Sequence, residues 1–193
     1  MKKRCVFFLN KKEKIILNSS IAWNKSTLLQ EIHIIFQSRR IELMIGQGIV
    51  VNILQDIVNG LEDALQNKRT LSNSCICKGN LGLYAIKDFG SCILEESSNQ
   101  DVLEECPHQS YRICAAKKRG AWIYNNAHGN IIFEITPWFE PTENTKKSIY
   151  EQWLQQYQPI VKRIIEPPVT QQWIAQMKTL LQIAKDNSKS DAE

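Results

Sequence analysis

The hydrophobic period of the sequence changes near residue 50, and this change constrains the fold more than any other feature. Residues 31–37 (EIHIIFQ) alternate apolar and polar side chains, and residues 40–45 (RIELMI) repeat the alternation. A period of two is typical of a strand with one buried face. The two segments therefore predict an antiparallel hairpin, although Ser38 and Arg39 are not a preferred turn pair.

After residue 50 the apolar residues recur every three to four positions, the period of an amphipathic helix. They are Val51, Leu54, Ile57, Val58, Leu61 and Leu65. Asn52 is the expected N-cap, and Gln55 three residues later would complete a capping box. The preceding GQG at 46–48 lacks the third glycine and the lysine of phosphate-binding loops, so we expect a tight turn there.

Strand patterns return in the second half of the chain. The candidates are residues 72–78, 80–89, 110–117, 121–125 and 130–136. The connections KKRG (117–120) and NNAHG (125–129) each end in a glycine, which suits a turn that requires a positive φ. Consecutive antiparallel pairs predict a meander whose apolar faces must be covered.

The last part of the chain predicts two helices. Residues 148–158 place apolar side chains on one side: Ile149, Trp153, Leu154 and Tyr157. Residues 166–186 begin with prolines, which are tolerated in a first helical turn. Their apolar stripe is Val169, Trp173, Ile174, Met177, Leu180, Leu181 and Ala184.

Together these patterns predict an α+β fold: a mainly antiparallel β-sheet with one inserted helix and two C-terminal helices packing on it. The 193 residues fit one domain, which at this size needs no metal or disulfide to bury a core. We expect a basic N-terminal arm over 1–14, a single α+β domain over 15–186 and a disordered tail over 187–193.

The net charge of +4 is concentrated near the N-terminus. Residues 1–14 hold six basic residues and one acid, a sum of +5, whereas the other 179 residues hold 18 basic and 19 acidic groups, a sum of −1. Because nucleic-acid binders usually carry a basic stripe on the folded domain, nucleic acid is not the expected partner. Binding of nucleic acid or a membrane surface through the basic arm is one alternative, and a plain solvated end is another.

The apolar segments are too short for export or membrane insertion. The run CVFFL after the first basic residues has five members, fewer than the roughly 7–15 of a signal-peptide core. No run approaches the roughly 20 apolar residues of a membrane span. We therefore expect a cytoplasmic protein whose cysteines stay reduced.

The stretch ECPHQSYRIC brings Cys106, His108 and Cys114 together in the sequence, and Cys75 and Cys77 form a second close pair. Zinc ligands usually have two to four residues between them, whereas these pairs have one. Cys114 has the small apolar neighbours of a core thiol. We expect buried cysteines and no cofactor. A zinc site of Cys75, Cys77, Cys106 and His108 and a Cys/His-dependent enzyme remain alternatives.

The sequence lacks the familiar catalytic and nucleotide-binding signatures, such as G-x-x-x-x-G-K-[ST], H-E-x-x-H and G-x-S-x-G. Glu134 and Glu140 form a candidate carboxylate pair near the end of a predicted strand. Acid–base work needs two carboxylates that face each other across a cleft. We expect Glu134 to point outward from an alternating strand, and an enzyme is not the favoured interpretation.

Two features instead indicate a protein-binding surface. Residues 88–105 contain six acids and no lysine or arginine, a composition that favours steering toward a basic partner. Trp138 and Phe139 lie between Pro137 and Pro141, and exposed aromatics of this kind are typical interface anchors. A solvated loop and an aromatic lid on the core are the respective alternatives.

The sequence therefore predicts a non-catalytic, cytoplasmic protein-binding domain. One version is an inhibitor or immunity-type protein that masks a basic partner such as a nuclease. The residues expected to contact that partner are Glu95, Glu96, Asp101, Glu104, Glu105, Trp138 and Phe139.

Overall fold

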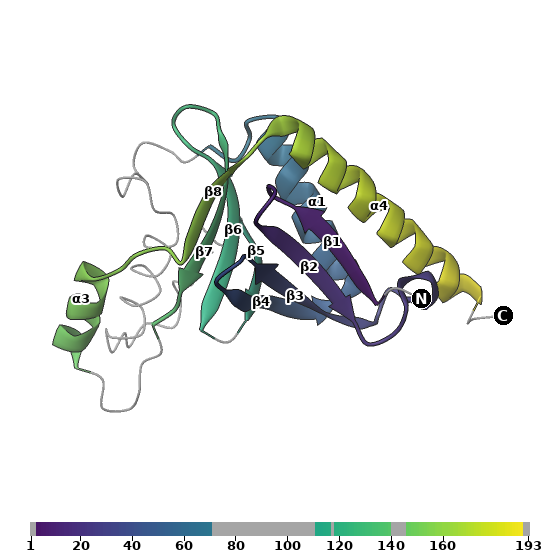
Figure 1. Cartoon of the computed structure of the whole chain (residues 1–193), viewed down its shortest axis with the longest axis horizontal. Helices are drawn as coiled ribbons and strands as arrows, with labels where there is room; N and C mark the ends of the chain where they lie inside the picture. Colours follow the sequence, from purple (N-terminus) through teal and green to yellow (C-terminus); the bar gives the residue numbers. More distant parts are fainter. Residues whose placement is uncertain (1–2, 71–110, 117, 140–145, 191–193) are drawn as a thin grey trace, which may run out of the picture.

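The computed structural model describes residues 3–70, 111–116, 118–139 and 146–190. Two four-stranded antiparallel sheets and three helices make up the described part, which confirms the predicted α+β class (Figure 1). The first sheet has the order β1-β2-β3-β4. Its strands are β1 (Arg4–Phe8), β2 (Lys14–Ser19), β3 (Glu31–Gln37) and β4 (Glu42–Ile49). The predicted hairpin over 31–45 is confirmed as β3 and β4.

The second sheet has the order β5-β6-β7-β8. Its strands are β5 (Arg112–Ala116), β6 (Arg119–Asn125), β7 (Ile131–Pro137) and β8 (Val161–Ile165). The first three strands form the predicted meander. The sequence did not predict β8, which pairs with β7 after an intervening helix.

The described helices are α1 (Val50–Leu65), α3 (Lys147–Gln155) and α4 (Pro167–Ser190), with a short 3-10 helix at Trp23–Lys25. The capping prediction for α1 is wrong, because the N-cap is Ile49 and no side chain caps it. The helix starts directly from β4, and backbone carbonyls supply the capping bonds. Val50 N–H donates to Gln30 O at 2.8 Å, and Val51 N–H donates to Leu28 O at 3.1 Å.

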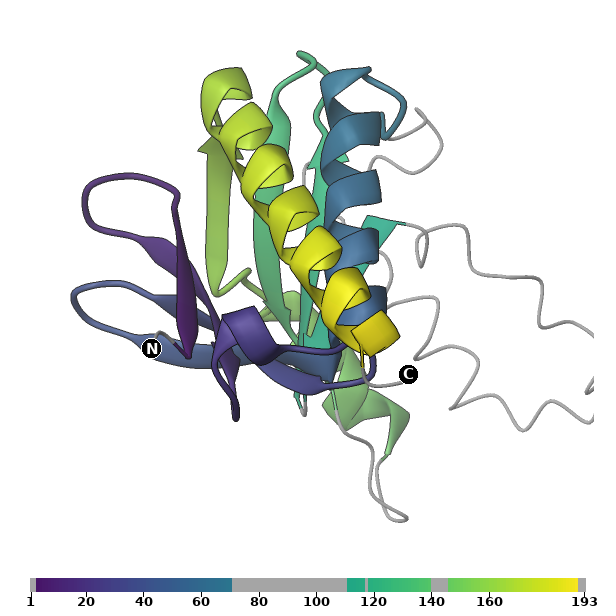
Figure 2. The same cartoon turned by 90° about the vertical axis from the view of Figure 1, so that its right-hand side faces the viewer.

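Both sheets and helices α1 and α4 contribute to one large hydrophobic core. Phe36 of β3 and Phe133 of β7 stack across it, with ring centroids 6.5 Å apart. The predicted stripe of α4 is buried there, including Trp173 and Met177. Lys178 of α4 and Glu62 of α1 form an ion pair of 2.5 Å at the surface. Figure 2 shows the two helices side by side over the sheets.

The GQG motif lies inside β4 and is not the tight turn that we expected. A Cβ atom at Gly46 would lie 2.7 Å from the Cβ of Cys114 in β5, which is closer than real Cβ contacts. The thiol of Cys114 donates to the carbonyl of Ile45 at 3.4 Å. Gly46 therefore lets the edges of the two sheets approach each other.

The two hairpin turns of the second sheet differ in how they obtain a positive φ. Gly129 has a φ of 76° in the turn after β6, as predicted. In the turn between β5 and β6, Lys118 takes a φ of 68°, while Gly120 lies within β6. The prediction for Gly120 is therefore wrong. Its missing side chain serves packing instead, because a Cβ there would lie 2.8 Å from Nε1 of Trp138.

Residues near both ends of the described part lie in regular elements. Residues 4–8 of the basic segment form β1, and α4 continues to Ser190 instead of ending near residue 186. The last turns of α4 have partners, since Leu28 N–H donates to Ser188 Oγ at 3.0 Å and Asn187 Nδ2 donates to Ser26 O at 2.8 Å. No described helix combines the length and apolarity that crossing a membrane requires.

Candidate functional site

The strand β1 has an open edge in the described part of the structure, because only β2 pairs with it. Ser19 N–H donates to Lys3 O at 2.9 Å, and Leu9 N–H donates to Glu13 O at 3.0 Å. Backbone groups alternate in direction along an antiparallel strand. The N–H and C=O groups of Arg4 and Val6 therefore point away from the sheet.

Helix α4 contacts this edge at Phe7 and Phe8. The indole Nε1 of Trp173 donates to the backbone carbonyl of Phe8 at 3.2 Å. The rings of Phe7 and Trp173 meet edge to face, with centroids 5.9 Å apart. This contact occupies the outward carbonyl of Phe8 and leaves those of Arg4 and Val6 next to the helix.

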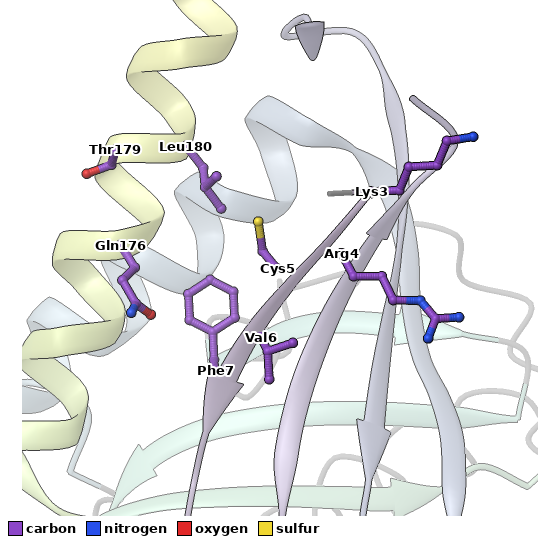
Figure 3. Close-up of a pocket in the computed structure, with 8 residues that line it drawn as sticks. All are labelled: Lys3, Arg4, Cys5, Val6, Phe7, Gln176, Thr179 and Leu180. Atoms are coloured by element: carbon purple, nitrogen blue, oxygen red, sulfur yellow. The ribbon is translucent and has the colours of Figure 1, made fainter. Parts of the chain in front are cut away.

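Beyond that contact a groove of about 790 Å³ lies between β1 and α4. Its lining residues are Lys3, Arg4, Cys5, Val6, Phe7, Gln176, Thr179 and Leu180 (Figure 3). Cys5 and Phe7 point toward α4 and Leu180 points toward them, while Arg4 and Val6 point to the other side of the strand. The groove therefore combines an apolar wall with a row of outward backbone groups.

This combination suits an extended polypeptide. An unpaired strand edge offers N–H and C=O groups to a further strand, and neighbouring pockets take alternate side chains of that strand. The charged lining residues, Lys3 and Arg4, point away from α4 (Figure 3), and the polar side chains that α4 contributes, Gln176 and Thr179, are uncharged. Affinity would therefore come from main-chain hydrogen bonds and from burial of apolar surface, at about 25 cal/mol per Å².

Most of the residues that the sequence singled out lie outside the described residues. The five acids of the expected binding surface are Glu95, Glu96, Asp101, Glu104 and Glu105. The four candidate zinc ligands are Cys75, Cys77, Cys106 and His108. Within the described ranges, no three His, Cys, Asp or Glu side chains are grouped so that they could hold a metal ion.

Trp138 and Phe139 are described, and both are half-buried. The guanidinium carbon of Arg112 lies 5.7 Å from the centre of the Trp138 ring. The Phe139 ring lies 5.0 Å from that of Tyr150 and 5.4 Å from that of Trp153, both in α3. The two aromatics thus pack between the sheet and α3, and their role as interface anchors stays a prediction.

Glu134 does not point to solvent, so that prediction is wrong. Its side chain is completely buried and accepts a hydrogen bond of 2.7 Å from the Tyr124 hydroxyl. Lys162 Nζ lies 3.6 Å away on the neighbouring strand. Both faces of β7 are buried, so the polar member of the alternation faces a second cluster with Trp122 and Tyr124.

The negative charge of Glu134 also acts on the phenol of Tyr157. Burial raises the pKa of Tyr157, and the negative charge of Glu134 raises it further. The side chain of Thr136 beside the hydroxyl lowers this pKa in part. A buried carboxylate that is held by a phenol and an ammonium group is a common structural arrangement, and we assign Glu134 no catalytic step.

Cys114 is a buried core thiol, as predicted. Burial is the main cause that raises its pKa to about 12. The thiolate is the nucleophilic form of cysteine. At neutral pH this residue therefore stays protonated, which makes it a poor candidate for the nucleophile of a Cys/His-dependent enzyme.

Comparison of the chain with protein-family models, with curated proteins and with solved structures found no match. The groove itself was missed because residues 1–14 were interpreted by their charge. The available signal was the segment CVFFL, a short continuous apolar run between charged residues. Such a run is consistent with a strand, although periodicity alone does not distinguish it from a helix segment.

Proposed function

We propose that this chain is a protein-binding domain that adds an extended segment of a partner to the open edge of β1, beside α4. The observation that carries the proposal is the outward row of backbone groups at Arg4 and Val6 next to an apolar groove. Strand addition of this kind is a recurring mode of peptide recognition.

The alternation of side chains along an added strand specifies the chemistry of the partner. Side chains on one face would enter the groove against Cys5, Phe7 and Leu180, where apolar groups are favoured. Side chains on the other face would lie beside the exposed Arg4, where acidic groups are favoured. The expected partner segment therefore alternates apolar and acidic residues.

The contact between Trp173 and Phe8 limits the length of the pairing. Because the indole already donates to the outward carbonyl of Phe8, that carbonyl is not available to an added strand. Pairing therefore runs along Arg4–Val6 and ends at Phe8. The partner contributes a short segment and not a long hairpin.

Peptide display on the purified chain tests this proposal. Selected peptides should alternate apolar and acidic residues. Val6→Pro removes an outward N–H at an edge position that tolerates proline, and Gln176→Trp fills the groove. Both changes should abolish binding of the selected peptides. The matched controls Val6→Thr and Gln182→Trp, the latter at an exposed position of α4 outside the groove, should leave it intact.

Selected peptides that bind both disrupted variants as well as the controls would contradict the proposal. Masking of a basic partner through residues 88–105 is a separate prediction, since those residues lie outside the described part. Its test is simultaneous neutralisation of Glu95, Glu96, Asp101, Glu104 and Glu105. That version fails if binding to a basic partner and the salt dependence of that binding do not change.

A further inference from the structure

Two hairpin turns of the first sheet lie next to each other at one end. Phe8, Lys14, Gln37 and Glu42 pair across all four strands and form the last row of the sheet. The connections at residues 9–13 and 38–41 both follow that row. Figure 2 shows the two connections projecting together from the same side of the molecule.

These turns bring together cations that are distant in the sequence. Lys11 and Lys12 are exposed in the first turn, and Arg39 and Arg40 are exposed in the second. Residues 9–14 and 37–42 together contain five basic and two acidic residues, a sum of +3.

Both acids at this end already have partners. Glu13 receives two hydrogen bonds from the Arg163 guanidinium, at 2.8 and 2.7 Å. Glu42 accepts one from Gln37 at 2.6 Å. The charge of Glu13 is compensated by Arg163, whereas Glu42 is bonded to a neutral amide and keeps its charge. The sum of +3 already counts both acids, so the turns form a positive patch that the sequence alone divided between two segments.

The outer face of the first sheet begins at this patch. Helices α1 and α4 pack on the opposite face, where Phe7, Leu17 and Leu43 contact the core. Phe8 lies on the outer face and is 60% exposed. The next row of the outer face is apolar and consists of Val6, Ile16, Ile35 and Met44. Arg4 begins the row after that.

We propose that this outer face, together with the two basic turns, binds single-stranded nucleic acid. The four cations of the turns would contact phosphates, because release of condensed counterions drives such binding. Phe8 would stack on a base, and the exposed Met44 with the half-buried Val6 and Ile35 would pack against neighbouring bases. A positive groove or patch with an exposed aromatic is the usual arrangement for single strands, whereas a duplex hides the faces of its bases.

The position of the apolar residues favours nucleic acid over an anionic membrane. A membrane-binding hairpin places its apolar side chains at the tip, where they enter the headgroup region. Here Asn10, Lys11 and Lys12 occupy one tip and Ser38–Arg40 the other, and the apolar Ile41, 38% exposed, follows the second tip. The exposed phenyl ring of Phe8 lies on the flat face behind the tips.

Fluorescence anisotropy with a labelled 20-nucleotide oligothymidylate and a labelled 20-nucleotide oligouridylate tests the charges. We expect binding whose logarithmic salt dependence has a slope of about −2.8, as four phosphate contacts to a single strand predict. Reversal of Lys11, Lys12, Arg39 and Arg40 to Glu should weaken binding more than about tenfold and flatten that slope. A matched control reverses four exposed lysines outside the turns: Lys25, Lys68, Lys185 and Lys189.

A second pair of variants tests the stacking contact. Phe8→Ala should weaken binding by between about 5-fold and about 150-fold, the range that loss of one base–aromatic stack produces. Phe8→Trp should retain binding. Leu29→Ala, at a 77% exposed position outside this face, is the control.

Gln176→Trp, which fills the groove beside α4, should not change oligonucleotide binding. Failure of the peptide-binding proposal can therefore be distinguished from failure of this one.

Three outcomes would overturn the inference. One is the absence of oligonucleotide binding at 50 mM salt by a chain that unfolds cooperatively. Another is equal weakening by the turn variant and the four-lysine control, which would assign the effect to net charge. The third is binding to vesicles of equal parts phosphatidylserine and phosphatidylcholine without oligonucleotide binding, which would assign the patch to membranes.

Discussion

The indole nitrogen of Trp173 donates a hydrogen bond to the backbone carbonyl of Phe8, and this bond fixes where α4 meets the open edge of β1. Next to the bond the helix and the strand pack together through Phe7. From Phe7 toward Lys3 the groove lies between them. The bond therefore marks where the open edge of β1 ends. It also stabilises the packing of α4 on β1.

Trp173→Phe should destabilise the protein by about 1–3 kcal/mol, because it removes the donor to Phe8 O and leaves a small void. Urea unfolding followed by circular dichroism measures the change. Exposed Gln182→Phe on the same helix serves as the control. An unchanged unfolding midpoint in Trp173→Phe would show that the bond does not hold α4 on β1.

Gly46→Ala should destabilise the protein by about 1–3 kcal/mol, since the added methyl group would overlap the Cβ of Cys114. Gly48→Ala is the matched control on the same strand. Its Cβ would approach only the flexible end of Ile53, at 3.3 Å. Thermal unfolding of the two variants should give a clearly lower midpoint for Gly46→Ala, and equal midpoints would contradict the close approach of β4 and β5.

Glu134→Ala should be more destabilising than Glu134→Gln. The alanine removes the acceptor of the Tyr124 hydroxyl and leaves a void at a fully buried position, a loss of about 2–4 kcal/mol. The glutamine keeps an acceptor oxygen for Tyr124. Chemical denaturation compares the free energies of unfolding of the two variants. A Glu134→Ala protein as stable as wild type would contradict the burial of this side chain.

Cys114 should react slowly with alkylating reagents and should make stability depend on alkaline pH. Its pKa is raised to about 12 by burial, so the protonated thiol favours the folded state. This contribution is complete below the unfolded pKa, near 9, and is lost as pH rises toward 12. Cys114→Ala should reduce that alkaline loss of stability, measured by denaturant unfolding between pH 8 and 11.

Peptide mapping after alkylation at pH 8 gives a second measurement on the same residue. The half-buried Cys5 should be modified before Cys114. Faster modification of Cys114 than of Cys5 in the folded chain would contradict the assignment of Cys114 as a core thiol.

Local periodicity predicted the elements that carry a regular stripe. The hairpin over 31–45, the helix after residue 50 and the stripe of α4 all follow from spacing that neighbouring residues share. Glu134 shows the limit of this reasoning. Alternation assigns a residue to a face of a strand, but it does not reveal that a second cluster covers that face.

The candidate surfaces depend on contacts between segments that are distant in the sequence. The spacing of apolar residues along the chain does not reveal such contacts. The patch at the hairpin turns exists because the register of the first sheet brings Arg39 and Arg40 next to Lys11 and Lys12. The groove exists because α4, more than 160 residues later in the chain, meets β1 at Phe8. In a single sequence, residues 1–14 showed mainly their charge, and the strand within them was missed.

Amide hydrogen exchange at Val6 and Phe7, followed by nuclear magnetic resonance, tests the open edge of β1 most directly. In the unbound chain the outward Val6 amide should exchange rapidly, while the Phe7 amide, which faces β2, should be protected. Addition of a peptide selected by display should slow exchange at Val6 and leave Phe7 unchanged. Protection of Val6 in the unbound chain, or a bound peptide that leaves Val6 unprotected, would contradict the proposed strand addition.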